Sequence, residues 1–423
     1  MAQDQTVRRK DAAKKQSKGQ LAKSEEEYKE ILSKPPGAND RSVREWEEAL
    51  MDLGQLYLDG KRVEDLTTLI QQTREMLPSF ARAKAAKLIR QLLDLFSEIP
   101  ESLDAQIKVT QSCIDWAVAQ RQGFLRQNLE VRLVGLYMQK QSYYDALTLI
   151  NRLLKELKRL DDKLVLVEVQ LLESRVYHAL GNMAKGRAAL TSARTSAASV
   201  YCPPLLQAGL DMQSGQLHAE DGDFNTAYSY FIEAMEGYHS QDETEKATSA
   251  LQYMLLCKIM VNSKDEVDQL LASKHAVRYA GPNLDAMKAV AQAHAHRSLD
   301  EYEGALHAYR QELGRDRFVA SHLQHLYDSM LEQNLIKVIE PFSRVEISHV
   351  ASIVGLDAPQ VERKLSQMIL DRVIVGVLDQ GAGVLVIYDE SERDRGYDAA
   401  LDTIEKLNNV VDVLYQTQAS MLE

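Results

Sequence analysis

The sequence predicts a mainly α-helical protein, in which a tetratricopeptide-like α-solenoid of helix pairs is followed by a winged helix and a C-terminal helix. First, the 423 residues include only 20 glycines and 9 prolines, so few residues interrupt helices. Second, a short signature recurs about every 40 residues over most of the chain. Third, the C-terminal part changes to a strand, helix, helix, hairpin order and ends in a heptad repeat.

The recurring signature has an apolar or aromatic residue at its first position and a small or apolar residue at its fourth. Its copies begin at Val63, Leu103, Tyr143, Met183, Phe224, Val267 and Tyr302. Two helices of about 15 residues fill such a step, and neither can bury its apolar stripe alone. We therefore expect stacked helix pairs over residues 22–315. The alternative is a globular all-α domain in which the spacing is accidental.

The copy at Tyr143 illustrates the expected packing of one helix pair. A tight turn at residues 139–142 separates two apolar stripes. Three side chains of the first stripe are expected to face four of the second: Leu133, Leu136 and Tyr137 against Ala146, Leu149, Ile150 and Leu153.

Residues 316–390 are predicted to form one more helix and a winged helix. Residues 321–337 have a helical apolar face, and residues 344–347 alternate as a short strand. Ser348 can cap a brief helix that stops at Gly355, and Asp357 can cap the next one. The β-rich runs at 373–378 and 384–388 then flank a glycine-containing turn, which indicates a hairpin.

The charge pattern favours a protein partner for this winged helix. Its second helix would present Gln360, Glu362, Arg363, Lys364, Gln367 and Asp371, in which two acids offset two bases. The whole chain carries 50 basic and 62 acidic residues, a net charge of −12. Such a surface repels nucleic-acid phosphates, so we expect no nucleic-acid partner. A nucleic-acid-binding winged-helix regulator remains the alternative from a different functional class.

The last segment, residues 395–423, carries a narrow apolar seam. Its members are spaced alternately four and three residues apart: Ala400, Ile404, Leu407, Val411, Leu414, Gln418 and Met421. This is the spacing of heptad a and d positions, and it requires an apolar partner. The seam can fold back on the body of the protein or join helices of other chains. The strict alternation favours other chains, so its apolar members are the predicted partner-binding residues.

No part of the sequence predicts catalysis, a cofactor or a metal. Gly381 and Gly383 lie within the hairpin and not between a strand and a helix, so they do not form a dinucleotide-binding loop. His294 and His296 point about 200° apart on a regular helix and cannot share one metal. His322 and His325 are one turn apart, but no third ligand stands at an obvious spacing.

Cysteine usage and the N-terminus bear on location. The chain has three cysteines, Cys113, Cys202 and Cys257, which lie far apart in the sequence. A small, odd number of separated cysteines suits reduced thiols in the cytosol or nucleus. No apolar run approaches the ~20 residues needed to cross a bilayer, so we expect no membrane partner. Residues 1–21 are basic and poor in large apolar side chains; we expect a mobile tail, with an import or transit segment as the alternative.

Several stretches carry a resemblance to a known family: residues 84–90, 92–96, 167–174, 188–195, 201–204, 253–260, 340–345 and 361–371. Together with the order of solenoid and winged helix, they resemble the PCI-domain subunits of the proteasome regulatory lid. The similarity runs from about Arg41 to the C-terminus, and the basic tail departs from it.

The resemblance implies a non-catalytic scaffold that clamps the lid and the ATPase base to the proteolytic core. It implies three kinds of partner, namely other PCI subunits of the lid, an ATPase of the base and an α-ring subunit of the core. It also implies a role in ATP-dependent degradation of ubiquitinated proteins, in both cytoplasm and nucleus. A PCI subunit of the related signalosome is the alternative within the same class.

Overall fold

The computed structural model describes residues 21–32, 40–76, 82–97, 99, 102–314, 316–388 and 395–422. Residues 1–20, which make up almost all of the predicted basic tail, lie outside the described residues. The chain divides into two compact units, residues 1–284 and residues 285–423.

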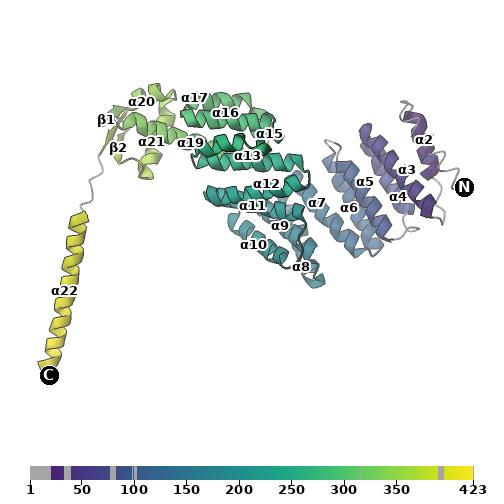
Figure 1. Cartoon of the computed structure of the whole chain (residues 1–423), viewed down its shortest axis with the longest axis horizontal. Coiled ribbons are helices and arrows are strands. Elements are labelled where there is room, and N and C mark those ends of the chain that lie inside the picture. Colours follow the sequence, from purple (N-terminus) through teal and green to yellow (C-terminus); the bar gives the residue numbers. More distant parts are fainter. Residues whose placement is uncertain are drawn as a thin grey trace. The chain divides into compact units, whose positions relative to one another are not determined.

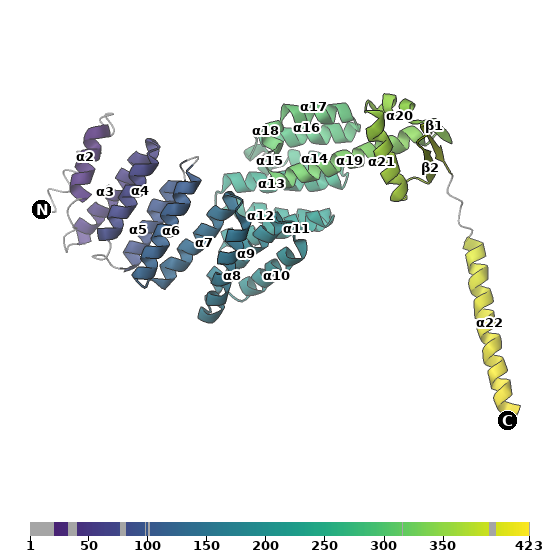
Figure 2. The ribbon, with the colours of Figure 1, turned by 180° about the vertical axis from the view of Figure 1, so that it is seen from behind.

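The first unit consists of helices throughout its described residues, and consecutive helices lie side by side (Figures 1 and 2). In chain order they are α2 (Leu21–Leu32), α3 (Asp40–Asp59), α4 (Val63–Met76), α5 (Arg82–Ser97), α6 (Leu103–Ala119), α7 (Gly123–Gln139), α8 (Tyr143–Leu160), α9 (Lys163–Ala179), α10 (Met183–Ala198), α11 (Pro204–Glu220), α12 (Phe224–Ser240), α13 (Thr244–Met260), α14 (Lys264–Leu271) and α15 (Lys274–Arg278). The helix α16 (Pro282–His296) begins at the division between the units.

The recurring signature marks the second helix of each pair. Helices α4, α6, α8, α10 and α12 begin on the first residue of a copy, namely Val63, Leu103, Tyr143, Met183 and Phe224. Val267 lies inside α14, and Tyr302 lies inside α17 (Leu299–Ala308). The predicted solenoid of helix pairs is therefore confirmed.

The helices from α6 to α10 are 16 to 18 residues long, and left-handed residues in the turns between them are evenly spaced. Arg121, Gln141, Asp161 and Gly181 have φ between 53° and 76°, and each lies two residues before the next helix. Their spacing is 20 residues, half of the period seen in the sequence. Most of the described residues with positive φ are not glycine, so the positions of glycine in the sequence do not reveal the 20-residue spacing.

Helix α7 has two apolar faces because helices pack on both sides of it. Val131 and Val134 share a core with α8 and α9, whereas Leu133 and Leu136 belong to the core that extends from α2 to α7. Of the four α8 side chains expected to face Leu133 and Leu136, Leu149 packs against the core that holds those two leucines. The other three, Ala146, Ile150 and Leu153, are buried in the core that holds Val131 and Val134. Tyr137 packs against both cores, so the expected facing is correct for Tyr137, whereas for Leu133 and Leu136 it is correct only toward Leu149.

Within the second unit, α17 is followed by α18 (Arg310–Gly314) and α19 (Arg317–Ile339). The winged helix then comprises β1 (Arg344–Glu346), α20 (Ile347–Val354), α21 (Ala358–Leu370), β2 (Gly376–Asp379) and β3 (Val384–Ile387). The strands form an antiparallel sheet in the order β1-β3-β2, with Val345 opposite Leu385 and Leu378 opposite Leu385. Leu335 of α19 and Leu365 of α21 are fully buried against this sheet. The predicted winged helix is confirmed.

Two details of the predicted winged helix are corrected. The first hairpin strand begins at Gly376 and not at Val373, because the N–H of Val373 still bonds to a carbonyl in the last turn of α21. Glu346 and not Ser348 precedes α20. Asp357 precedes α21, but its side chain accepts no hydrogen bond from the helix.

The helix α22 (Arg395–Leu422) completes the described chain. Of all described helices, none combines the length and apolar character that a membrane span requires.

Candidate assembly interface

The described side chains of α22 are exposed along its whole length. Ile404, Leu407 and Val411 are each 58% exposed, and Leu414 is 59% exposed. Ala400 is exposed as well. Met421, the last predicted member of the seam, lies outside the described side chains. The described members of the predicted seam therefore share one exposed helix face.

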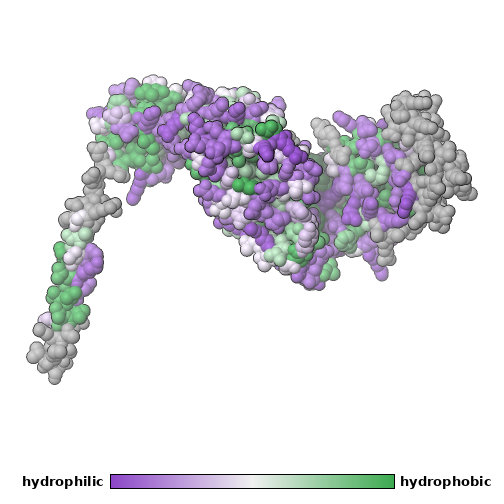
Figure 3. Space-filling view, in the orientation of Figure 1, coloured by the Kyte–Doolittle hydropathy of each residue, from purple (hydrophilic) through white to green (hydrophobic). Residues whose placement is uncertain are grey.

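The apolar face of α22 is wider than the predicted seam. Leu401, Val410 and Tyr415 flank the seam and are also more than half exposed. At about 100° per residue, these side chains extend the face to about half of the helix circumference. The opposite face carries polar and charged residues, including Lys406, which pairs with Asp402 at 2.6 Å. Figure 3 shows the two faces as green and purple strips along the helix. A face this wide suits burial among several helices better than a two-helix seam.

The edge of the winged-helix sheet offers a second apolar surface. Because the strand order is β1-β3-β2, strand β2 has a neighbour on one side within the described residues. Val377 of β2 is 54% exposed at this edge. In the segment before the strand, Val373 and Val375 are 49% and 43% exposed, and Leu370 is 80% exposed. An edge strand with free backbone groups and exposed β-branched side chains is able to pair with a strand of another chain.

The surface of α21 is poorly suited to nucleic acid. The ammonium of Lys364 lies 2.8 Å from a carboxylate oxygen of Glu332 and 3.9 Å from one of Asp328, both on α19. Glu362 accepts a 2.5 Å hydrogen bond from Gln380 in the hairpin turn, which holds its negative charge on this surface. The positive charge of Lys364 is thus neutralised within the module, and the nucleic-acid alternative is not favoured.

The histidine pairs do not form metal sites in the described residues. His322 is 4% exposed and packs against the ring of Phe318, whereas His325 lies on the exposed side of α19. His296 bonds through Nδ1 to Glu301 at 2.8 Å, and burial lowers the pKa of His294. Across the described ranges, no three His, Cys, Asp or Glu side chains stand close enough to hold a metal ion.

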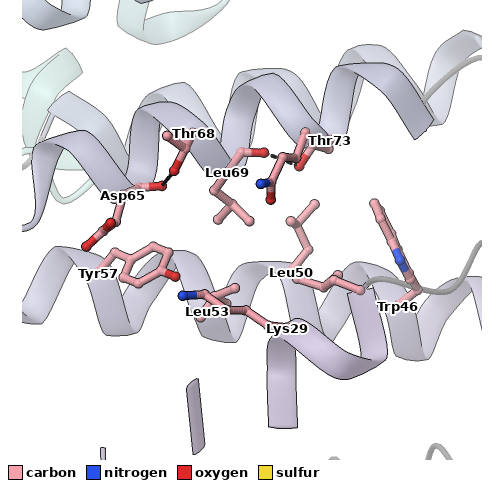
Figure 4. A pocket seen from close by; sticks show the side chains of 11 residues that line it. Lys29, Trp46, Leu50, Leu53, Tyr57, Asp65, Thr68, Leu69 and Thr73 are labelled. Carbon is pink, nitrogen blue, oxygen red and sulfur yellow. Dashed lines mark hydrogen bonds between the residues drawn. The ribbon is translucent and has the colours of Figure 1, made fainter. Parts of the chain in front are cut away.

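A pocket of about 530 Å³ lies between α3 and α4 of the first unit, with α2 at its edge (Figure 4). Apolar side chains form about half of its lining: Leu32, Trp46, Leu50, Leu53 and Leu69. At the edge, the ammonium of Lys29 pairs with Glu25 at 2.6 Å and lies 5.9 Å from the ring centroid of Tyr57. Because this charge is already paired, the pocket suits an apolar side chain of a partner protein better than a charged small molecule.

Comparison with known proteins accounts for almost the whole chain. Three family models match: the 26S proteasome regulatory subunit RPN6 N-terminal domain at residues 5–140, the PCI domain at 306–389, and the RPN6 C-terminal helix domain at 393–419. The probable 26S proteasome regulatory subunit rpn6 of Schizosaccharomyces pombe is 54% identical over 93% of this chain and 94% of its own. The chain belongs to the Rpn6 family of 26S proteasome regulatory subunits.

Other Rpn6 relatives agree. The 26S proteasome regulatory subunit RPN6 of Saccharomyces cerevisiae is 47% identical over 91% of this chain and 89% of its own. The 26S proteasome non-ATPase regulatory subunit 11 homolog of Arabidopsis thaliana is 46% identical over 92% of each chain. These relatives are all named as proteasome subunits, which supports the proteasome over the signalosome alternative.

The Rpn6 C-terminal helix model spans Ala400 to Leu414, the described part of the predicted partner-binding residues. Leu401, Val410 and Tyr415 were missed from the sequence because strict a/d spacing skips them. The edge of β2 was also missed, since strand order within a sheet decides which strand is exposed.

Proposed function

We propose that this Rpn6-family chain is a non-catalytic structural subunit of the 26S proteasome regulatory lid. In this proposal it clamps the lid and the ATPase base to the proteolytic core, and so supports ATP-dependent degradation of ubiquitinated proteins. The main observation in favour is the exposed apolar face of α22, which spans about half of the helix circumference. Exposed apolar surfaces of this kind mark contacts with a partner protein.

The two units suit different contacts in this proposal. The apolar face of α22 and the edge of β2 would meet other PCI-domain subunits of the lid, by helix packing and by strand pairing respectively. The helix pairs of the first unit would reach an ATPase of the base and an α-ring subunit of the core. The three separated, unpaired cysteines fit a location in the cytoplasm and nucleus, where thiols stay reduced.

Removal of residues 395–423 tests this function. We expect the truncated, affinity-tagged chain to fold, because α22 contributes no side chain to the described cores of the protein. In affinity purification with mass spectrometry, we expect it to recover far fewer lid, base and core subunits than the full chain. A circular dichroism melt matching that of the full chain provides the control for folding. Equal recovery of proteasome subunits by both chains would rule out the role proposed for α22.

A further inference from the structure

A basic groove lies on the first unit between α8 and α10, with α9 as its floor. The hollow has a volume of about 430 Å³. Lys155 and Lys158 stand one helical turn apart on the α8 wall, and Lys185 stands on the α10 wall. Tyr177 and Gln170 of α9 lie between them. We call these five residues, together with Glu173, the lysine groove.

None of the three lysines forms an ion pair with a described residue, and the charge of Lys158 acts on the carboxyl of Glu173 at longer range. The neighbouring ion pairs use other residues, such as Arg152 with Glu130 at 2.6 Å and Arg126 with Glu156. No described carboxylate lies within 4.0 Å of any of the three lysine ammoniums. Glu173 is the one acidic residue among those lining the hollow. The groove therefore has a net charge of about +2 on a chain whose net charge is −12.

The floor of the groove holds a buried amide with unused hydrogen-bonding capacity. Gln170 is 6% exposed, and its buried Oε1 has no hydrogen-bond partner among the described residues. Buried polar groups are rarely left unpaired, because the loss of hydration is then not offset. An amide in this position can both donate to and accept from a peptide backbone. Beside it, the ring centroid of Tyr177 lies 5.6 Å from the ammonium of Lys185.

We propose that the lysine groove binds an acidic, extended peptide segment of a partner protein. Aspartate or glutamate side chains of that segment pair with Lys155, Lys158 and Lys185, while its backbone bonds to Gln170. Three separate ammoniums on flexible stems match spaced carboxylates, whereas a single phosphate is typically held by arginine forks and helix N-termini. This inference does not depend on assembly into the proteasome.

Fluorescence anisotropy of a fluorescein-labelled peptide of alternating glutamate and alanine tests the groove on the full chain. We expect saturable binding that weakens as salt rises from about 50 to 300 mM, because added ions screen the charge pairs. The triple variant Lys155→Gln, Lys158→Gln, Lys185→Gln is expected to weaken binding by at least about tenfold, since each pair contributes a few-fold. Gln170→Leu, which keeps the size of the side chain, is expected to weaken it by about threefold.

A matched triple variant provides the control for general charge. Lys264, Lys274 and Lys288 are exposed and are not among the residues that line the groove, so changing all three to glutamine removes the same charge. We expect this variant to bind the peptide within about twofold of the parent chain. Absence of saturable binding, or an equal loss in both triple variants, would overturn the proposal. So would stronger competition by tripolyphosphate or a single-stranded oligonucleotide than by unlabelled peptide. Circular dichroism melts of each variant separate loss of binding from loss of fold.

Discussion

The hydroxyl of Tyr302 donates a 2.7 Å hydrogen bond to the carbonyl oxygen of Leu323. Tyr302 opens the last copy of the repeat signature in α17, and Leu323 lies in α19, the helix that leads into the winged helix. The tyrosine side chain is 0% exposed, and burial raises its pKa above the ordinary value of 10.0. One buried bond therefore ties the last repeat to the helix that supports the winged module.

Replacement of this hydroxyl is expected to lower stability and to change its dependence on pH. Tyr302→Phe should reduce the free energy of unfolding of the second unit by about 1–2 kcal/mol, because the hydrogen bond is lost inside the core. In the parent chain, the unfolded tyrosine ionises near pH 10 while the folded one does not, so stability should fall as pH rises above 10. Thermal melts at pH 8, 10 and 11 should show a smaller decline for the variant. If the stability of both proteins declined equally above pH 10, groups other than Tyr302 would cause the decline.

A matched pair of substitutions tests the apolar face of α22. Val411 lies in the seam and is 58% exposed, whereas Val413 lies on the opposite side of the helix and is 61% exposed. Val411→Asp should reduce co-purification of the chain with proteasome subunits at least about tenfold, because a buried unpaired charge is costly at an interface. Val413→Asp introduces the same residue at similar exposure and should leave co-purification unchanged. Equal behaviour of the two variants in quantitative mass spectrometry would contradict the orientation assigned to the helix.

Close packing between α11 and α12 is expected to require a glycine. A Cβ atom at Gly215 would lie 2.6 Å from Cε1 of Phe231, which is 0% exposed and packs edge-on to Tyr253 at 5.3 Å between ring centroids. Gly215→Ala should therefore destabilise the first unit by about 1–3 kcal/mol, because the ring must move within a filled core. Gly135→Ala is the control, since no atom lies within 4 Å of its added Cβ. That variant should gain about 0.5–1 kcal/mol in chemical denaturation.

A buried carboxylate gives a second pH-dependent prediction. Asp211 is 3% exposed, burial raises the pKa of its carboxyl above 3.8, and Gln207 donates hydrogen bonds of 3.2 and 3.0 Å to its two oxygens. The folded state thus holds its proton more tightly than the unfolded state, so the contribution of this group to stability falls as pH rises upward from about 4. Asp211→Asn keeps a bond from Gln207 and should remove that decline. Urea titrations between pH 4 and 7 measure the difference.

Thiol labelling should distinguish the three cysteines in the folded chain. Cys113 and Cys257 are 0% and 1% exposed, and burial raises the pKa of their thiols to about 11 and about 12. Cys202 is half-buried, with a smaller rise in pKa. At pH 8, a thiol reagent should modify Cys202 first and the other two after addition of denaturant, since the thiolate is the reactive form. Peptide mapping identifies the labelled site, and early labelling of Cys113 would contradict the packing of α6.

Local patterns were sufficient to predict most elements of this fold. The copies at Tyr143 and Phe224 fall on the first residues of α8 and α12, because a helix start depends on residues that are close in sequence. The positive φ of Gln141 was not predictable in the same way. Non-glycine residues adopt positive φ uncommonly, so a glutamine in the sequence gives no sign of that conformation.

The candidate site was predictable only in part. The seam from Ala400 to Leu414 lies on one helix, and helical periodicity alone places its members on one face. The lysine groove unites Lys155 and Lys158 with Lys185, which is on another helix. Their proximity follows from the stacking of α8, α9 and α10, and no sequence spacing encodes that distance.

By itself the sequence determined the repeat of helix pairs, the winged helix and the apolar stripe of the last helix, because each is set by residues within a few turns of one another. Only the tertiary structure decided which face of α7 meets which neighbour, which strand forms the sheet edge and which charges stay unpaired. Those properties depend on distances between residues far apart in the chain, and packing of side chains in three dimensions sets such distances.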